Sequence, residues 1–321
     1  MSEAVSVRQA AALLSEADNI VILLHRFPDG DTIGCGYALA YALRALDKSV
    51  RVECADEIPE KYEYINRPVL LSEFPADFVC AVDVADPKLL GHAMAHYADR
   101  VDLCIDHHGS NTGYAKNLCL DAACGAACMI VMQVIEALGV ELDAYLANAL
   151  YTGLATDTGC FKYGNTSALT HRQAATLIEC GADYAHINRI MFDIKSRSRL
   201  ELERRALDSI RFYENDRVAV MTVTDEMIAR SGVSENDMEG LAPLPRQIEG
   251  VWVGITLRQR PDGAFKVSLR TGDRVNASEV CALLGGGGHA AAAGCTLGSD
   301  VEENIAALLG AVRTVCPHIG E

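Results

Sequence analysis

Short apolar runs rich in β-branched residues alternate with longer Ala- and Leu-rich stretches from residue 1 to about residue 190. The short runs predict strands and the longer stretches predict helices. The predicted strands are 20–24, 50–54, 78–83 and 101–105, and the predicted helices are 32–46, 126–138 and 144–155. Such alternation is typical of βαβ units. We therefore expect an α/β fold over residues 1–190, with a mainly parallel sheet and helices on both of its faces.

The composition changes after residue 190. Residues 191–214 are dense in charged side chains, and Leu200, Leu207 and Ile210 recur there at roughly helical spacing. This pattern is typical of a helix whose surface is largely solvated. We expect a helical linker over residues 191–214.

The last third of the chain alternates apolar and polar residues as strands do. The segments are 217–224, 251–260 and 264–271. A Pro-Asp-Gly turn at 261–263 predicts a hairpin between the last two. A predicted helix over 277–284 and a run of four glycines follow. We expect a smaller α+β domain over residues 215–321.

The overall composition agrees with two globular domains. Half of the 321 residues are apolar, which suffices for two separate cores. No long stretch lacks charged and polar breaks, and the N-terminal segment carries acids rather than a basic leader, so we expect a soluble cytoplasmic protein without a membrane partner. The twelve cysteines are scattered singly through apolar runs, which predicts small buried thiols rather than disulfides.

The net charge of −16 limits the class of partner. Proteins that coat long DNA or RNA are normally basic, because the phosphate backbone dominates their affinity. We therefore expect no binding to long duplexes. A phosphate-bearing substrate would be short and would be held by a few local cations.

Acidic and imidazole side chains follow several predicted strands or interrupt predicted helical sequence. They are His25, Asp29, Asp31, Asp83, Asp106, His107, His108 and Asp157. In parallel sheets, ligands collect beyond the carboxyl ends of the strands. Carboxylates gathered in one place would repel each other and have raised pKa values unless a cation held them together. The pattern therefore predicts a catalytic metal centre.

The segment 25–31 has a simpler interpretation as well. It places three metal-competent side chains within seven residues, but an Asp-rich turn after a strand with one buried histidine would look similar. Three glycines, Gly30, Gly34 and Gly36, are predicted to let the backbone turn tightly and let the next helix approach the sheet.

The later acids also have alternatives. A strand-terminal Asp can cap a helix, although Asp86 before Pro87 suits that role better than Asp83. Asp157 is predicted to lie between two threonines inside an apolar helix, where an Asp costs helix propensity and is rarely placed for stability.

The motifs taken together resemble the DHH phosphoesterase family with its DHH-associated C-terminal domain. They are H-x-x-P-D-G-D at 25–31, a strand-terminal Asp, D-H-H-G at 106–109, A-T-D-T-G at 155–159 and G-G-G-G-H at 285–289. Length and layout are most similar to the bacterial nano-RNase branch, which degrades very short RNAs and removes a phosphate from 3′-phosphoadenosine 5′-phosphate (pAp).

The resemblance implies two manganese ions, with Mg²⁺ or Co²⁺ as other candidates. It assigns His25, Asp29 and Asp83 to the first ion, and it assigns Asp31, Asp83, His107 and Asp157 to the second. It also implies that Asp106 orients His107, that His108 contacts the scissile phosphate, and that Asp83, Asp106 and His108 are catalytic. Mixed carboxylate and imidazole ligands suit Mn²⁺ better than all-thiolate or all-oxygen sites would.

The resemblance also implies substrate-binding residues. They are Asn165 in the loop 161–167, Arg270, Gly286, Gly287, Gly288 and His289. An arginine can bind a terminal phosphate through two hydrogen bonds, and a glycine run can offer backbone N–H groups to an anion. The loop 161–167 has a simpler role too, because Thr166 or Ser167 could cap the next helix.

The resemblance implies a metal-dependent phosphodiesterase that hydrolyses short oligoribonucleotides to mononucleotides and acts on pAp, with the second domain closing over the first. The alternative is a phosphodiesterase of cyclic or linear dinucleotides such as c-di-AMP or pApA. A single-strand exonuclease or a nucleotide sensor without turnover is less expected. Homodimer formation stays open.

Overall fold

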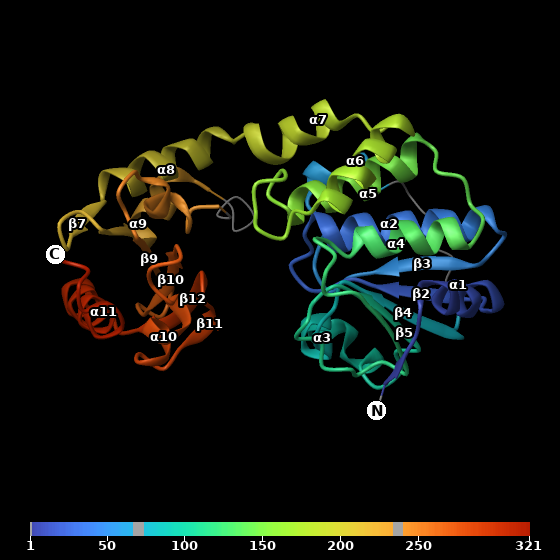
Figure 1. The fold of residues 1–321 in the computed structure, drawn as a ribbon, viewed down its shortest axis with the longest axis horizontal. Coiled ribbons are helices and arrows are strands. Elements are labelled where there is room, and N and C mark those ends of the chain that lie inside the picture. The colour runs from blue at the N-terminus through green and yellow to red at the C-terminus, as the bar shows by residue number, and fades with distance from the viewer. Residues whose placement is uncertain (1, 67–73, 234–239) are drawn as a thin grey trace. The chain divides into compact units, whose positions relative to one another are not determined.

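The computed structural model describes residues 2–66, 74–233 and 240–321, which form two compact units, Met1–Ile194 and Lys195–Glu321 (Figure 1). Each unit contains a six-stranded sheet and a hydrophobic core of its own. The predicted α/β class is confirmed, while the division at residues 190 and 214 stays a prediction. In the part of the chain that the structure describes, no helix has the length and apolarity needed to span a bilayer.

The sheet of the first unit is parallel throughout, in the order β1-β6-β5-β4-β2-β3. Its strands are β1 (Glu3–Ala4), β2 (Ile20–Leu23), β3 (Val50–Glu53), β4 (Phe78–Val82), β5 (Leu103–Asp106) and β6 (Asn117–Leu120). The apolar runs predicted β2 to β5. The sequence does not reveal β1 or β6, because these strands are too short and too polar to show a clear period.

The order of the strands reverses beside β2. The chain passes from β2 to β3 on one side, and then returns to place β4, β5 and β6 on the other side. At such a reversal the connections leave the sheet in opposite directions, and a crevice opens beyond the carboxyl ends of the strands. The loops after β2 and β4 therefore meet at the position where ligands of open α/β sheets bind.

Helices cover both faces of this sheet, as predicted, but to different extents (Figure 1). One face carries α1 (Val7–Glu16), α2 (Gly30–Ala45) and α4 (Cys128–Ala137), with α5 (Ala144–Asp157), α6 (Ala168–Glu179), α7 (Tyr184–Asn188) and η4 (Arg189–Asp193) after them in the chain. Among the described residues, the other face carries only the short helical segments η2 (Pro87–Leu90), α3 (Gly91–Met94) and η3 (Ala95–Tyr97). A further short turn is η1 (Glu60–Tyr62).

Helix α2 is buried along most of its length because it lies between the sheet and α5. A Cβ atom added at Gly36 would lie 2.5 Å from Leu24 Cδ2, which confirms that this glycine lets α2 approach the sheet. At Gly34 the same atom would lie 2.4 Å from the Ala149 carbonyl oxygen of α5. The prediction that Gly34 lets α2 approach the sheet is therefore wrong, since this glycine lets α2 approach α5.

The sheet of the second unit has the order β11-β12-β10-β9-β8-β7 and is antiparallel except between β8 and β9. Its strands are β7 (Arg211–Tyr213), β8 (Val218–Val223), β9 (Val253–Gln259), β10 (Phe265–Thr271), β11 (Gly287–His289) and β12 (Ala292–Leu297). Its helices are α8 (Arg197–Asp208), α9 (Asp225–Ser231), η6 (Leu244–Gln247), α10 (Ala277–Ala282) and α11 (Val301–Val315). The predicted hairpin at 261–263 joins β9 and β10.

Helix α8 forms half of the charged segment 191–214, for which we predict a solvated helical linker, and β7 follows it within the same segment. Its Leu202 and Ala206 are buried against Met221 and Val223 of β8, whereas Leu200 is half exposed. The charged surface is confirmed for one side of the helix only. Of the three apolar residues noted in the sequence, Leu200 and Leu207 are exposed and Ile210 packs against this cluster, because contact with the sheet selects which residues are covered.

Candidate metal centre

The loop after β2 brings His25 and Asp29 against Asp83, the residue that follows β4. His25 Nε2 lies 3.6 Å from Asp29 Oδ1 and 3.6 Å from Asp83 Oδ2. His25 Nδ1 donates to the Arg26 carbonyl oxygen at 2.8 Å, which fixes the imidazole with Nε2 toward the two carboxylates. These three side chains have ligand atoms close enough to hold one cation.

A second set of ligand atoms surrounds His107. Its Nε2 lies 3.9 Å from Asp31 Oδ2, 3.6 Å from Asp83 Oδ1 and 3.5 Å from Asp157 Oδ2. His107 Nδ1 donates to the Cys124 carbonyl oxygen at 3.2 Å, so this imidazole is also fixed from behind. Asp31, His107 and Asp157 can hold another cation.

Asp83 joins the two sets, since one of its oxygens is near His25 and the other is near His107. The residue is only 4% exposed, and its Oδ1 has no hydrogen-bond partner among the described residues. Its backbone has φ +59°, in the left-handed region that non-glycine residues rarely adopt. Strain of this kind persists where the surrounding structure requires it, and it concentrates at functional sites. Asp83 therefore has the geometry of a bridging ligand.

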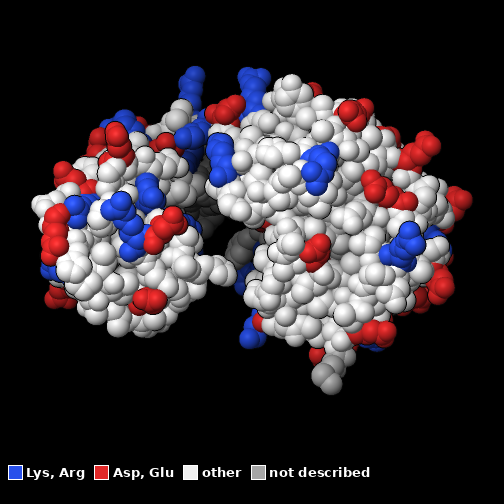
Figure 2. Space-filling model, viewed as in Figure 1, with Lys and Arg blue, Asp and Glu red and all other residues white. Residues whose placement is uncertain are grey.

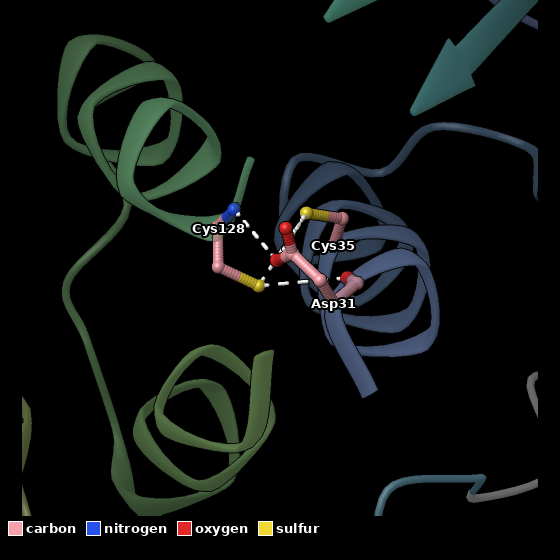
Figure 3. A group of neighbouring side chains, drawn as sticks. All are labelled: Asp31, Cys35 and Cys128. Carbon is pink, nitrogen blue, oxygen red and sulfur yellow. Dashed lines mark hydrogen bonds between the residues drawn. The ribbon is translucent and has the colours of Figure 1, made fainter. Parts of the chain in front are cut away.

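Asp31 is held by the start of α4 as well as by its own helix. Its Oδ2 accepts a hydrogen bond from the Ala127 N–H at 2.6 Å. Its Oδ1 accepts one from the Cys128 N–H at 3.0 Å, which is drawn in Figure 3. The N-terminus of a helix stabilises a carboxylate there. This arrangement fixes the orientation of a carboxylate that is only 1% exposed.

The electrostatics of the centre require a positive partner. Burial, together with the charge of Asp31, raises the pKa of Asp83 well above its usual value, and burial likewise raises the pKa of Asp31. The same causes raise the pKa of Asp157 to about 8. His107 Nε2, like Asp83 Oδ1, is buried without a hydrogen-bond partner in the described part of the chain. Divalent cations of the Mn²⁺ type fit these atoms, because they accept mixed oxygen and imidazole ligands.

Asp106 is fully buried and contacts the imidazole of His108, not that of His107 as the resemblance implied. Its Oδ1 lies 2.8 Å from His108 Nδ1 and also accepts the backbone N–H of His107. Its Oδ2 accepts the Asn111 side-chain N–H at 2.6 Å. The hydrogen bond to Asp106 outweighs burial and raises the pKa of His108 to about 9. Asp106 thus orients His108 and favours its protonated form.

Sequence reasoning missed Asn111. The residue is also bonded to the backbone of this loop, because its side-chain Oδ1 accepts the Gly113 N–H at 2.8 Å and its backbone N–H donates to the His108 carbonyl oxygen at 2.9 Å. An Asn a few residues after a D-H-H motif, in a short loop, is a signal for such a role, since Asn commonly bonds to nearby backbone.

Asp157 is the last residue of α5 and does not interrupt a helix as predicted. Thr158 is the C-cap, and Gly159, Cys160 and Phe161 then adopt positive φ. Gly159, with φ +57°, begins the turn that ends the helix, and glycine is common at this position. A position at the helix terminus lets the carboxylate reach His107.

The loop after α5 has a structural role in the first unit. The Asn165 amide donates to the Gly125 and Asp157 carbonyl oxygens at 2.9 and 3.1 Å. Ser167 caps α6 in a capping box with Thr170, which confirms the simpler interpretation of this loop. Asn165 itself is exposed and lies next to the backbone of a candidate metal ligand.

The other predicted substrate-binding residues lie in the second unit. Arg270 is on β10 and is partly buried, and its guanidinium bonds to the Leu269 carbonyl oxygen at 3.0 Å. The glycine run forms the edge strand β11, which ends at His289, and these residues are mostly exposed. Gly288 has φ +147° and an added Cβ there would lie 2.6 Å from the Ala292 carbonyl oxygen. Gly288, and Gly286 just before β11, are thus required by the close approach to β12, whereas an added Cβ at Gly287 would meet nothing within 4 Å.

Two family models match the chain. Residues 19–154 match the model described as "DHH family, N-terminal domain", and residues 215–316 match the DHHA1 domain. The bifunctional oligoribonuclease and PAP phosphatase NrnA of Thermus thermophilus is 33% identical, over 98% of this chain and 95% of that protein. The cyclic-di-AMP phosphodiesterase PdeA of Listeria monocytogenes is 21% identical, over 86% of this chain and 44% of that protein.

Solved structures show the same fold. An exopolyphosphatase-related protein from Bacteroides fragilis superposes with a TM-score of 0.87 at 24% identity, over 98% of this chain and 97% of that chain. The exonuclease RecJ bound to manganese gives a TM-score of 0.53 at 16% identity, over 97% and 94% of the two chains. The two family models, the full-length relative and the gathered D-H-H centre agree, and the chain belongs to the DHH family of phosphoesterases.

Proposed function

We propose that this protein hydrolyses short oligoribonucleotides to mononucleotides and removes a phosphate from pAp, in the cytoplasm, with two Mn²⁺ ions. The observation that carries the proposal is Asp83, a buried and strained carboxylate between two histidines, with one oxygen that lacks a partner among the described residues. The name of the Thermus thermophilus relative supports this choice of substrates.

The residues divide into two ligand sets in this proposal. His25, Asp29 and Asp83 would hold one ion, and Asp31, His107 and Asp157 would hold the other, with Asp83 shared. A pair of divalent cations supplies a water of lowered pKa and stabilises charge on the attacking and leaving oxygens of a phosphate ester. The buried carboxylates keep these ions in place, while the more exposed side chains leave room for the substrate.

His108 has a separate role. Its Nδ1 is bonded to Asp106, and the side chain is 45% exposed, so its Nε2 remains available to a phosphate oxygen. The hydrogen bond to Asp106 favours the protonated imidazole, which can donate a charged hydrogen bond. We assign His108 to the scissile phosphate on this basis.

Substrate binding by Asn165, Arg270, Gly286, Gly287, Gly288 and His289 is part of the same proposal. Arg270 supplies a guanidinium for a terminal phosphate, and β11 is an edge strand whose outer backbone groups are not used by another strand. The net charge of −16 supports a short substrate, because a long polyanion would be repelled.

A dinucleotide phosphodiesterase is the second candidate. It is favoured by the similarity to PdeA of Listeria monocytogenes, although the chain spans less than half of that protein. Both candidates use the same metal centre, so they differ only in the preferred substrate.

The experiment compares hydrolysis of pAp, a labelled RNA dinucleotide, pApA and a long single-stranded RNA by the purified full-length protein with Mn²⁺. Asp83→Asn should abolish hydrolysis of every substrate. Asp86→Asn is the matched control, because Asp86 is a nearby acid that only caps η2. Hydrolysis by Asp83→Asn at the rate of the control would refute the metal centre, and preference for the long RNA would refute the proposed substrate class.

A further inference from the structure

Two thiols lie directly behind Asp31, on the opposite side from the proposed ions. Cys35 is one turn after Asp31 in α2, and Cys128 begins α4 (Figure 3). Their sulfur atoms are 3.4 Å apart, and Cys35 Sγ lies 3.6 Å from Asp31 Oδ1. All twelve cysteines are free thiols, as predicted from their scattered positions. These two differ from a random core pair because both adjoin a candidate metal ligand.

The space for this pair is created by a glycine on the facing helix. A Cβ atom added at Gly153 of α5 would lie 2.2 Å from Cys128 Sγ and 2.7 Å from Asp31 Oδ1. No side chain larger than hydrogen is therefore compatible with this arrangement. The surrounding helices close the space completely, since Cys35 is 0% and Cys128 is 2% exposed.

Two of the three pairs of ligand atoms already have separations close to those of a tetrahedral metal site. Zinc bonds of about 2.3 Å to sulfur and about 2.1 Å to oxygen place two sulfur ligands about 3.8 Å apart, and a sulfur and an oxygen about 3.6 Å apart. The observed Cys35–Cys128 and Cys35–Asp31 distances are 3.4 and 3.6 Å. Only small movements would be needed to admit an ion, and all pairs of ligand atoms in this group are within 4.8 Å.

We propose that Asp31, Cys35 and Cys128 form a binding site for one thiophilic divalent cation, such as Zn²⁺ or Cd²⁺, and that its occupation inhibits the enzyme. The inhibition rests on the proposed function, but the binding does not. Thiolate ligands select such cations over Mn²⁺ and Mg²⁺. Both thiols lose their protons to solvent when the ion binds, and the site then carries three negative ligands around a charge of +2.

Inhibition follows from the position of Asp31. Its Oδ1 is the atom nearest the thiols, and its Oδ2 is the atom nearest His107. An ion on Oδ1 competes with the Cys128 N–H that now holds this oxygen and draws electron density from the whole carboxylate. Asp31 then binds the catalytic ion less well. Because the thiols are closed to solvent, an ion must wait for the helices to separate, and inhibition should develop slowly.

The test adds Cd²⁺ to the full-length Mn²⁺-loaded protein and records ultraviolet sulfur-to-cadmium absorption and pAp hydrolysis over time. A Cys35→Ser/Cys128→Ser variant should lose part of the cadmium absorption. It should also lose the slow phase of inhibition, with its hydrolysis rate expressed relative to the rate of the same variant without Cd²⁺. The matched control is Cys281→Ser/Cys295→Ser, which removes the neighbouring thiol pair of the second unit. That control should retain the slow phase.

Equal cadmium absorption and equal slow inhibition in wild type and Cys35→Ser/Cys128→Ser would overturn the site. If the double variant does not fold, Cys35→Ser alone serves, and it should weaken Cd²⁺ binding measured by equilibrium dialysis. Absorption needs no substrate, so a protein that binds Cd²⁺ at these thiols but hydrolyses nothing would contradict the proposed function and leave the site intact. Loss of activity without thiolate absorption would mean that Cd²⁺ only displaces Mn²⁺, and this too would overturn the site.

Discussion

Gly153→Ala should destabilise the protein although the change favours helix formation. Gly153 lies inside α5, where alanine is favoured over glycine by about 1 kcal/mol. The new methyl group would lie 2.2 Å from Cys128 Sγ and 3.0 Å from Asp31 Cα, and neither α2 nor α4 can move without disturbing the sheet beneath them. Overpacking of this kind typically costs about 1–3 kcal/mol. We expect a net loss of up to about 2 kcal/mol in the free energy of unfolding.

Gly310→Ala is the matched control for helix propensity. Gly310 is also inside a helix, α11, but an added Cβ meets nothing within 4 Å. This variant should gain about 1 kcal/mol, so the difference between the two variants isolates the steric cost. The free energy of unfolding is measured by urea denaturation, and the transition of the first unit is followed separately if the two units unfold independently.

A second substitution tests the assigned contact. Cys128→Ala removes the sulfur atom that the new methyl group would strike, so adding it to Gly153→Ala should recover part of the loss, and the two changes should be strongly non-additive. Equal stabilisation by Gly153→Ala and Gly310→Ala would refute the reasoning. Strict additivity of Gly153→Ala and Cys128→Ala would show that the strain lies elsewhere.

Three further outcomes are expected. Removal of divalent cations by a chelator should abolish hydrolysis. In the cation-free protein, the free energy of unfolding should decrease as the pH rises from about 4 to about 8, because the raised pKa of Asp157 makes the folded form bind more protons than the unfolded form. Denaturation at several pH values checks this, and added Mn²⁺ should remove the pH dependence. Asn111→Ala should lower kcat more than it raises KM, because Asp106 and His108 lose their orientation; equal loss of kcat in a distant core variant of the same stability would contradict this role. Arg270→Ala should raise KM about tenfold or more with a smaller change in kcat, as expected for the loss of one charged hydrogen bond. Steady-state kinetics with pAp measures both constants, and an unchanged KM would exclude Arg270 from substrate binding.

The sequence predicts the first sheet better than it predicts helix ends. Apolar runs define β2, β4 and β5 because those strands are buried on both faces, and burial selects residues without charge. The end of α5 was predicted at residue 155, two residues before Asp157, because the polar residues and Gly159 mark a helix end without fixing the residue at which the backbone leaves the helix. The same limit applies to α8, where contact with β8 decides which side is apolar.

The candidate site was predicted as a set of residues but not as a set of contacts. Strand-end positions indicated which acids and histidines would gather, because parallel strands present their carboxyl ends at one edge. They could not indicate that Asp106 binds the imidazole of His108, which depends on the rotation of two neighbouring side chains. Nor could they indicate the pairing of Cys35 with Cys128, which are brought together by two helices far apart in the sequence.

Occupation of the centre and stability of the first unit must be coupled. Asp83 is buried, has a raised pKa and adopts a strained backbone conformation, and each of these features costs free energy in the folded state without a cation. A cation that binds only the folded form offsets these costs and stabilises the protein by mass action. Asp83→Asn should therefore reduce the stability of the cation-free protein much less than that of the Mn²⁺-loaded protein, because the amide removes a buried charge and a ligand at once. Thermal unfolding of both proteins with and without Mn²⁺ measures this, and an equal effect of the substitution in both conditions would contradict the placement of Asp83 between two ions.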